Sequence, residues 1–161
     1  MTKKTKITII SILVIILIVG CIIFFPKKSD NLTLTNIQSN VILSKTSEKN
    51  LKQLYGKPKK RNTNIHDVNK KYYYSDGLEG TINDNLDNYW NEMRYDKKAP
   101  LKDTRNYDYY LEYSGKNLGV NYVRFFFWKD RVYDIQFGNK IVNENAAKKD
   151  KYLKKILPYE G

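Results

Sequence analysis

Few side chains of this chain could take part in catalysis, and they are scattered. The single histidine, His66, has Asp67 as its neighbour, but adjacent residues seldom place a base and its partner usefully. The single cysteine, Cys21, lies inside a long apolar segment, which argues against thiol catalysis. One cysteine and one histidine exclude an intramolecular disulfide, a cysteine-based metal site and a histidine cluster.

Paired carboxylates are the remaining route to acid–base chemistry. Asp108 and Glu112 could share one face, and so could Asp84 and Asp87. Such pairs are common on the outward face of a strand and in the first turn of a helix, where they have no catalytic role. The chain also has no phosphate-binding loop, dinucleotide fingerprint or zinc spacing. The sequence therefore predicts no catalytic residues, no cofactor and no metal.

Basic and aromatic side chains are better candidates for function, because they suit binding to an anionic or mixed partner. The chain has 29 basic and 17 acidic residues, a net charge of +12, and 14 tyrosines. Bases gather in residues 57–61, and aromatic side chains in residues 72–74 and 120–128. The predicted binding residues are Lys59, Lys60, Arg61, Tyr72, Tyr73, Arg124, Phe126 and Trp128.

Residues 7–25 form an uncharged apolar segment, which basic residues flank on both sides. As a helix rising about 1.5 Å per residue, this segment spans about 28 Å, close to the thickness of a bilayer core. The segment predicts a single-pass anchor in the cell membrane, with residues 1–6 as a cytoplasmic tail. The positive charges favour a cytoplasmic N-terminus and hence an extracytoplasmic domain.

The residues around Cys21 leave a second kind of anchor open. Residues 18–21 read Ile-Val-Gly-Cys and resemble a bacterial lipobox, in which the signal is cut before the cysteine and the cysteine is lipidated. Apolar residues follow this cysteine, where mature lipoproteins have small polar ones. An uncleaved transmembrane segment is the prediction and lipidation at Cys21 is the alternative; both place the domain beside a membrane.

Predicted helices are expected to position some of these candidate residues. The composition predicts a polar stalk over 26–43 and a folded domain over 44–161. Residues 46–55 predict a helix capped by Thr46 and ended by Gly56. Two further helices are predicted, over 81–93 and from Glu144 to the proline at 158, the second capped by Asn143.

Strands are predicted over 72–74, 107–113, 120–128 and 131–137, with a tight turn at Lys129 and Asp130. Together they predict an antiparallel meander with one covered face. The alternating aromatic residues cannot all face one core. If the final helix leaves the second face uncovered, an aromatic patch is exposed there.

Two stretches resemble a known family. Residues 54–58, Leu-Tyr-Gly-Lys-Pro, resemble the helix ending in Leu-Gly-x-Pro of the beta-lactamase-inhibitor-like domains in SmpA/OmlA-type envelope lipoproteins. Residues 123–133 resemble the strand–turn–strand that closes such units. The chain departs from that pattern by Tyr55 before the glycine and by the helix expected over 82–94. The resemblance implies a small envelope domain that binds protein without catalysis, and it supplies no site residue.

These features predict an α+β protein with an N-terminal transmembrane helix, followed by a small antiparallel sheet with two or three short helices. The predicted function is a membrane-anchored, extracytoplasmic, non-enzymatic binding module of a bacterial cell envelope. Its expected partner is an envelope protein or an anionic wall polymer. The alternatives are an envelope hydrolase, an inhibitor of one, or an accessory protein of DNA uptake or conjugation, although the anchor disfavours nucleic acid as the partner.

Overall fold

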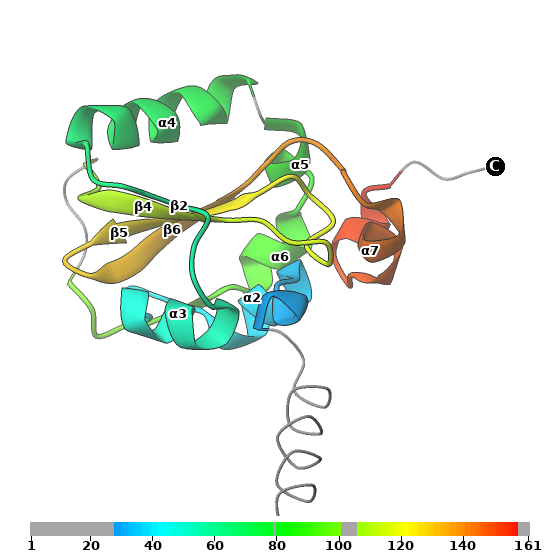
Figure 1. Ribbon diagram of the computed structural model, residues 1–161, viewed down its shortest axis with the longest axis horizontal. Helices are drawn as coiled ribbons and strands as arrows, with labels where there is room; N and C mark the ends of the chain where they lie inside the picture. The colour runs from blue at the N-terminus through cyan, green and yellow to red at the C-terminus, as the bar shows by residue number, and fades with distance from the viewer. Residues whose placement is uncertain (1–27, 79, 101–105, 158–161) are drawn as a thin grey trace, which may run out of the picture.

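The computed structural model describes residues 28–78, 80–100 and 106–157, which form a four-stranded sheet with helices on both of its faces and a separate two-stranded sheet (Figure 1). The predicted fold class is confirmed in its coarser form, an α+β arrangement of an antiparallel sheet and short helices. The anchor predicted over 7–25, with Cys21, lies outside the described residues. Within the described part of the chain, no helix combines the length and the apolar character needed to cross a bilayer.

The sheet has four antiparallel strands, and the two that follow one another most closely pair through a two-residue turn. Their order is β2 (Lys60–Asn62), β4 (Tyr109–Tyr113), β5 (Val123–Trp128) and β6 (Arg131–Phe137). Aromatic and β-branched residues fill β4, β5 and β6, because such side chains pack well on a pleated surface. Lys129 and Asp130 both have positive φ, 48° and 57°, the backbone that a tight turn between twisted strands requires. This turn and the bounds of β6 are as predicted.

The larger core lies on the face of the sheet toward α3 (Glu48–Tyr55) and α2 (Leu34–Asn40) (Figure 1). Side chains from these helices, from α6 (Asp87–Glu92) and from the C-terminal segment join the inward residues of the strands there. Among the strand residues in this core, Leu111, Phe125, Phe127 and Phe137 are at most 1% exposed. Burying large apolar side chains in this way is the main favourable term in the folding free energy.

Helix α3 begins one residue later than predicted, because Ser47 rather than Thr46 is its cap. The Ser47 hydroxyl accepts from the Asn50 N–H at 3.2 Å, and the Asn50 side chain accepts from the Ser47 N–H at 3.1 Å. This reciprocal pair satisfies two backbone donors at the helix start. Thr46 instead accepts a hydrogen bond from the Ile42 N–H at 2.9 Å. Gly56 ends the helix with a positive φ of 81°, as predicted.

The second face of the sheet is covered by α4 (Ile65–Leu78), which Figure 1 shows above the strands. A smaller core forms between them from Val68, Tyr107, Tyr110 and Phe126, and Tyr72 packs against it. The strand predicted over 72–74 is therefore wrong, because this tyrosine-rich run is helical and Val68 and Tyr72, four residues apart, both face the sheet. The exposed aromatic patch expected on this face is likewise absent, since α4 covers it.

The stalk predicted over 26–43 is wrong for most of its length. After a short turn, η1 (Lys28–Asn31), the chain enters the fold, and four apolar residues there are at most 1% exposed: Leu32, Leu34, Ile37 and Val41. Their spacing places Leu34, Ile37 and Val41 on one side of α2, which packs into the larger core. The next residues form β1 (Ile42–Leu43), which pairs in parallel with β3 (Arg94–Tyr95).

The C-terminal segment closes the fold against α2. Asn143 caps α7 (Glu144–Lys149) as predicted, but the helix ends there, and η2 (Leu153–Lys155) follows. Asp150 lies between the two and is buried. Its Oδ2 accepts from the Thr35 N–H and hydroxyl at 2.9 and 3.0 Å, and its Oδ1 accepts from the Tyr152 and Leu153 N–H groups. This carboxylate joins two segments separated by 115 residues.

The single helix predicted over 81–93 is instead two short helices, α5 (Gly80–Asp84) and α6. The break has a physical cause, because Asn83 and Trp90 are fixed by contacts that a straight helix would not allow. The Trp90 indole N–H donates to the Asn83 carbonyl at 2.8 Å, seven residues back. Counting α2, α4 and α5 as well, the described residues hold more helices than the two or three predicted.

Candidate functional site

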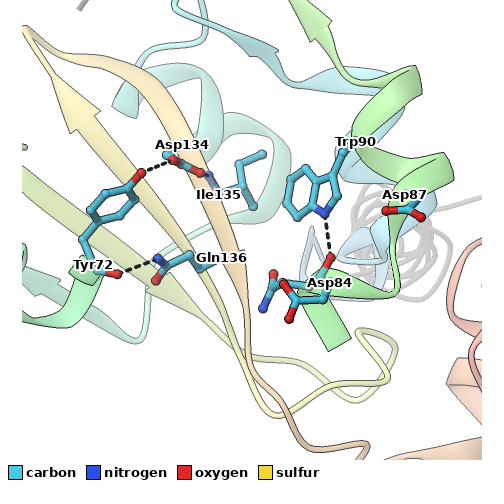
Figure 2. Close-up of a pocket in the computed structure, with 8 residues that line it drawn as sticks. Tyr72, Asp84, Asp87, Trp90, Asp134, Ile135 and Gln136 are labelled. Carbon is cyan, nitrogen blue, oxygen red and sulfur yellow. Dashed lines mark hydrogen bonds between the residues drawn. The ribbon is translucent and has the colours of Figure 1, made fainter. Parts of the chain in front are cut away.

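A pocket of about 430 Å³ opens beside the edge strand β6, between α4 and the α5–α6 pair (Figure 2). Its size falls in the range that small-ligand sites occupy. Its lining residues are Tyr72 from α4, Asn83, Asp84, Asp87 and Trp90 from α5 and α6, and Asp134, Ile135 and Gln136 from β6. None of these residues except Tyr72 was among the predicted binding residues.

Asn83 attaches α5 and α6 to the sheet by behaving like a residue of a further strand. Its side-chain amide donates to the Phe137 carbonyl at 2.7 Å and accepts from the Phe137 N–H at 3.0 Å. This pair replaces the two backbone bonds that a neighbouring strand would supply. Since Trp90 donates to the Asn83 carbonyl, the same residue also fixes the indole ring at the wall of the pocket.

Asp134 is held in place by three donors. Its Oδ2 accepts from the Tyr72 and Tyr107 hydroxyls at 3.0 and 3.2 Å, and its Oδ1 accepts from the Ile135 N–H at 2.6 Å. Burial first, and then the negative charge of Asp134, raises the pKa of Tyr107 well above its usual value. Tyr107 is therefore a proton donor to this carboxylate at neutral pH, and the three hydrogen bonds fix the orientation of Asp134.

Gln136 forms the inner wall of the pocket and is only 7% exposed. Its Nε2 donates to the Tyr72 carbonyl at 3.2 Å, which fixes the orientation of the amide, as Figure 2 shows. Its Oε1 is buried and receives no hydrogen bond from the described residues. A buried acceptor without a donor costs roughly 1–3 kcal/mol. Such a group is unusual in a folded protein and indicates a place where a ligand could supply the donor.

The rim of the pocket is negatively charged. Asp84 and Asp87 are exposed, and neither side chain makes a hydrogen bond or an ion pair with the described residues. No described lysine or arginine lines the pocket. The site is therefore locally acidic in a chain whose net charge is +12. In the described part of the chain no group of histidine, cysteine or acidic side chains is arranged to hold a metal ion.

The carboxylate pairs considered for acid–base chemistry do not form a buried pair. Asp84 and Asp87 are exposed at the rim. Asp108 is exposed and accepts from the Lys129 N–H at 2.7 Å, while Glu112 pairs with Arg124 at 2.9 Å. His66 and Asp67 lie exposed in the first turn of α4 and do not line the pocket. These positions give the hydrolase alternative no support.

The predicted basic cluster is exposed on β2 and the residue before it, and two of its three members rest on tyrosine rings. Lys60 Nζ lies 5.9 Å from the centroid of the Tyr110 ring, and the Arg61 guanidinium lies 4.4 Å from that of Tyr109. Arg61 also pairs with Glu48 at 3.4 Å. Lys59 is exposed beside them. Two members of the cluster, Lys60 and Arg61, therefore already make contacts within the domain.

Glu48 makes this corner of the domain sensitive to acid. Burial alone would raise its pKa, but hydrogen bonds from Lys52 and Tyr109, with the charges of Arg61 and Lys52, lower it below the usual 4.5. A lowered carboxyl pKa in the folded state contributes stability above the unfolded value, and that contribution is lost as the pH falls through the folded pKa.

Glu48→Gln is therefore expected to cost about 0.5–1 kcal/mol at pH 7 and less at pH 3. Urea unfolding of both proteins at the two pH values measures the difference. A penalty that stays constant from pH 7 to pH 3 would show that the charge of Glu48 does not contribute.

The remaining predicted binding residues do not share one surface. Phe126 is buried under α4, and Arg124 is buried in its pair with Glu112. Tyr73 is 44% exposed on α4. Trp128 is half-buried at the end of β5, where the Lys129 ammonium lies 4.4 Å from its ring centroid. Among these residues only Tyr72 lines the pocket, where its hydroxyl contacts Asp134.

The sequence contains little that marks the pocket. Asp84 and Asp87 stand out as a carboxylate pair, but nothing local connects them to Asp134 or Gln136, about fifty residues away along the chain. The connection is the long-range contact of Asn83 with Phe137. No family model, curated protein or solved structure matches this chain, so the family resemblance stays a prediction.

Proposed function

We propose that this protein is a membrane-anchored, extracytoplasmic module that binds a ligand without transforming it, and that the pocket beside β6 is the binding site. The observation that carries the proposal is Gln136, a buried side chain in the pocket wall whose Oε1 receives no donor from the described residues. A site whose walls are fixed by hydrogen bonds, and which keeps an unused acceptor, is suited to recognition.

The side chains around the pocket support binding more than catalysis. Asp134 accepts hydrogen bonds from two phenols, and the described lining residues include no serine, cysteine, histidine or lysine that could act as a nucleophile or base. The long apolar segment over 7–25 supports the membrane location, as an uncleaved anchor or as a lipidated one at Cys21. An envelope protein or another envelope component is the expected source of the ligand.

Site-specific photocrosslinking in intact cells tests this proposal. A photoreactive amino acid replaces Asp87 at the rim of the pocket, and a control variant carries it at Asn145, which is exposed on α7. We expect the full-length Asp87 variant to acquire an adduct of discrete mass that the Asn145 variant lacks. Equal labelling at both positions, or none at either, would contradict the assignment of the pocket as the binding site.

A further inference from the structure

We infer that the pocket beside β6 binds an organic cation that carries N–H donors, of the alkylammonium class. This inference rests on the proposed function and names the chemistry of its ligand. It follows from two independent features of the pocket: the balance of hydrogen-bond donors and acceptors in its walls, and its charge.

The side chains in the pocket that carry N–H or O–H groups already donate to the protein itself. The Trp90 indole donates to the Asn83 carbonyl, the Gln136 amide to the Tyr72 carbonyl, and the Tyr72 hydroxyl to Asp134. The Asn83 amide donates to the Phe137 carbonyl in the same way. The Gln136 and Asn83 amides each keep one further N–H, and these are the few donors that the described walls offer a ligand.

Acceptors, in contrast, remain available. Gln136 Oε1 is buried without a donor from the described residues. The N–H and carbonyl of Phe137 point away from β5 and bond to Asn83. Ile135 lies two residues earlier on β6 and has the same orientation, so the Ile135 carbonyl also points to the free edge of that strand. The Asp84 and Asp87 carboxylates carry no ion pair with described residues. A ligand that supplies donors suits this excess of acceptors.

The charge of the pocket makes that ligand a cation. Among the described lining residues there are three carboxylates, those of Asp84, Asp87 and Asp134, and no basic side chain. Figure 2 shows Asp134 and Asp87 on opposite sides of the Trp90 ring, with Asp84 below the ring. Aromatic rings and carboxylates together are the usual surroundings of bound ammonium groups. A bare metal ion is disfavoured, since the described acidic residues form no group able to ligate one.

An ammonium group could reach the pocket from two sources, a free diamine or the lysine side chain of an envelope protein. Both present the same N–H donors and the same charge at the end of an alkyl chain. Cadaverine represents the first source, and a lysine blocked at both its amino and carboxyl ends represents the second. Pentanediol, which is uncharged and of the length of cadaverine, is the control ligand.

The indole N–H signals in the NMR spectrum of the full-length protein in lipid nanodiscs provide the measurement. The chain has two tryptophans, Trp90 in the pocket and Trp128 at the far end of β5, so each titration carries an internal control. We expect cadaverine, the blocked lysine or both to shift the Trp90 signal with saturation and to leave that of Trp128 in place. Pentanediol should shift neither.

Neutralising the rim separates this model from nonspecific attraction. In Asp84→Asn with Asp87→Asn we expect roughly tenfold weaker binding, because two exposed ion pairs together are worth about that factor. The matched control is Asp67→Asn with Glu144→Gln, which changes the net charge equally at two exposed positions outside the pocket, and it should bind as the native protein does.

Three results would overturn the inference: no saturable shift of Trp90 with either cation, an equal shift with pentanediol, or equal weakening in the two double variants. The photocrosslinking experiment is independent of these results. Specific labelling at Asp87 without cation binding would leave the binding module standing and reject only the ligand class. The tighter of the two cationic probes identifies the source of the ammonium group.

Discussion

Replacing Phe126 with alanine is expected to lower the free energy of unfolding by about 3–5 kcal/mol. The Phe126 ring is 0% exposed between α4 and the sheet, and its centroid lies 5.3 Å from those of Tyr72 and Tyr107. Its removal leaves a cavity that the hydrogen-bonded sheet on one side and the tyrosines on the other cannot close. Urea unfolding followed by circular dichroism measures the change.

Ile65→Ala is the matched control, because Ile65 begins the same helix and is 59% exposed. We expect this variant to stay within about 0.5 kcal/mol of the native protein. The sequence alone predicts Phe126 as a surface residue that binds a partner. If Phe126→Ala were as stable as Ile65→Ala, the second core beneath α4 would be refuted, and a role of Phe126 in binding a partner would again be the better interpretation.

The second large effect is expected at the Arg124–Glu112 pair. The two side chains are 8% and 16% exposed, and Arg124 Nε lies 2.9 Å from Glu112 Oε2. The Arg124 guanidinium also lies 4.0 Å from the centroid of the Tyr122 ring. Arg124→Met would leave the carboxylate without its counter-charge in a largely desolvated place, so we expect a loss of about 2–4 kcal/mol. Thermal and urea unfolding measure it.

Removing both charges should be less harmful than removing one. We expect Glu112→Leu combined with Arg124→Met to be more stable than Arg124→Met alone, because the penalty comes from the stranded carboxylate rather than from the lost attraction. Additive losses in the double variant would show that the pair contributes mainly through packing. If Arg124→Met were as stable as the native protein but did not acquire the photocrosslink at position 87, Arg124 would instead be identified as a binding residue.

The features that the sequence predicts well are those set by local chemistry. The turn at Lys129 and Asp130, the extent of β6, the cap at Asn143 and the stop at Gly56 all depend on residues that lie within a few positions of one another. Local preferences and tertiary packing agree at these places, so the sequence pattern is sufficient to predict the local structure.

The wrong predictions occur where a local preference opposes packing. The run at residues 72–74 has the aromatic composition of a strand, yet the need to cover Phe126 and Tyr110 makes it part of α4. The polar composition of the predicted stalk conceals a helical spacing of Leu34, Ile37 and Val41 that was already present in the sequence. Periodicity was the better guide in that segment.

The candidate site depends on contacts that no sequence pattern reports. Asn83 lies 54 residues before Phe137, and its role as a substitute for a strand becomes visible only once the chain is folded. The unused acceptor of Gln136 is equally invisible, since its exposure and partners follow from α4 and β6 together. The predicted basic and aromatic residues were chosen for their type, which does not show that Arg124 and Phe126 are buried or that only Tyr72 lines the pocket.

The two edges of the sheet have a consequence for the membrane anchor that we propose. At one edge of the sheet, β2 carries the exposed charges of Lys60 and Arg61. At the other edge, β6 is already hydrogen-bonded: Val132 bonds to the backbone of Ser44 and Thr46, and Phe137 bonds to the Asn83 side chain. Neither border offers a neighbouring copy a run of free backbone long enough to extend the sheet. Tethering confines molecules to two dimensions and raises their encounter rate, the condition in which edge-to-edge aggregation is most damaging. If the proposed anchor is correct, this domain can therefore be crowded on a membrane without polymerising through its strands.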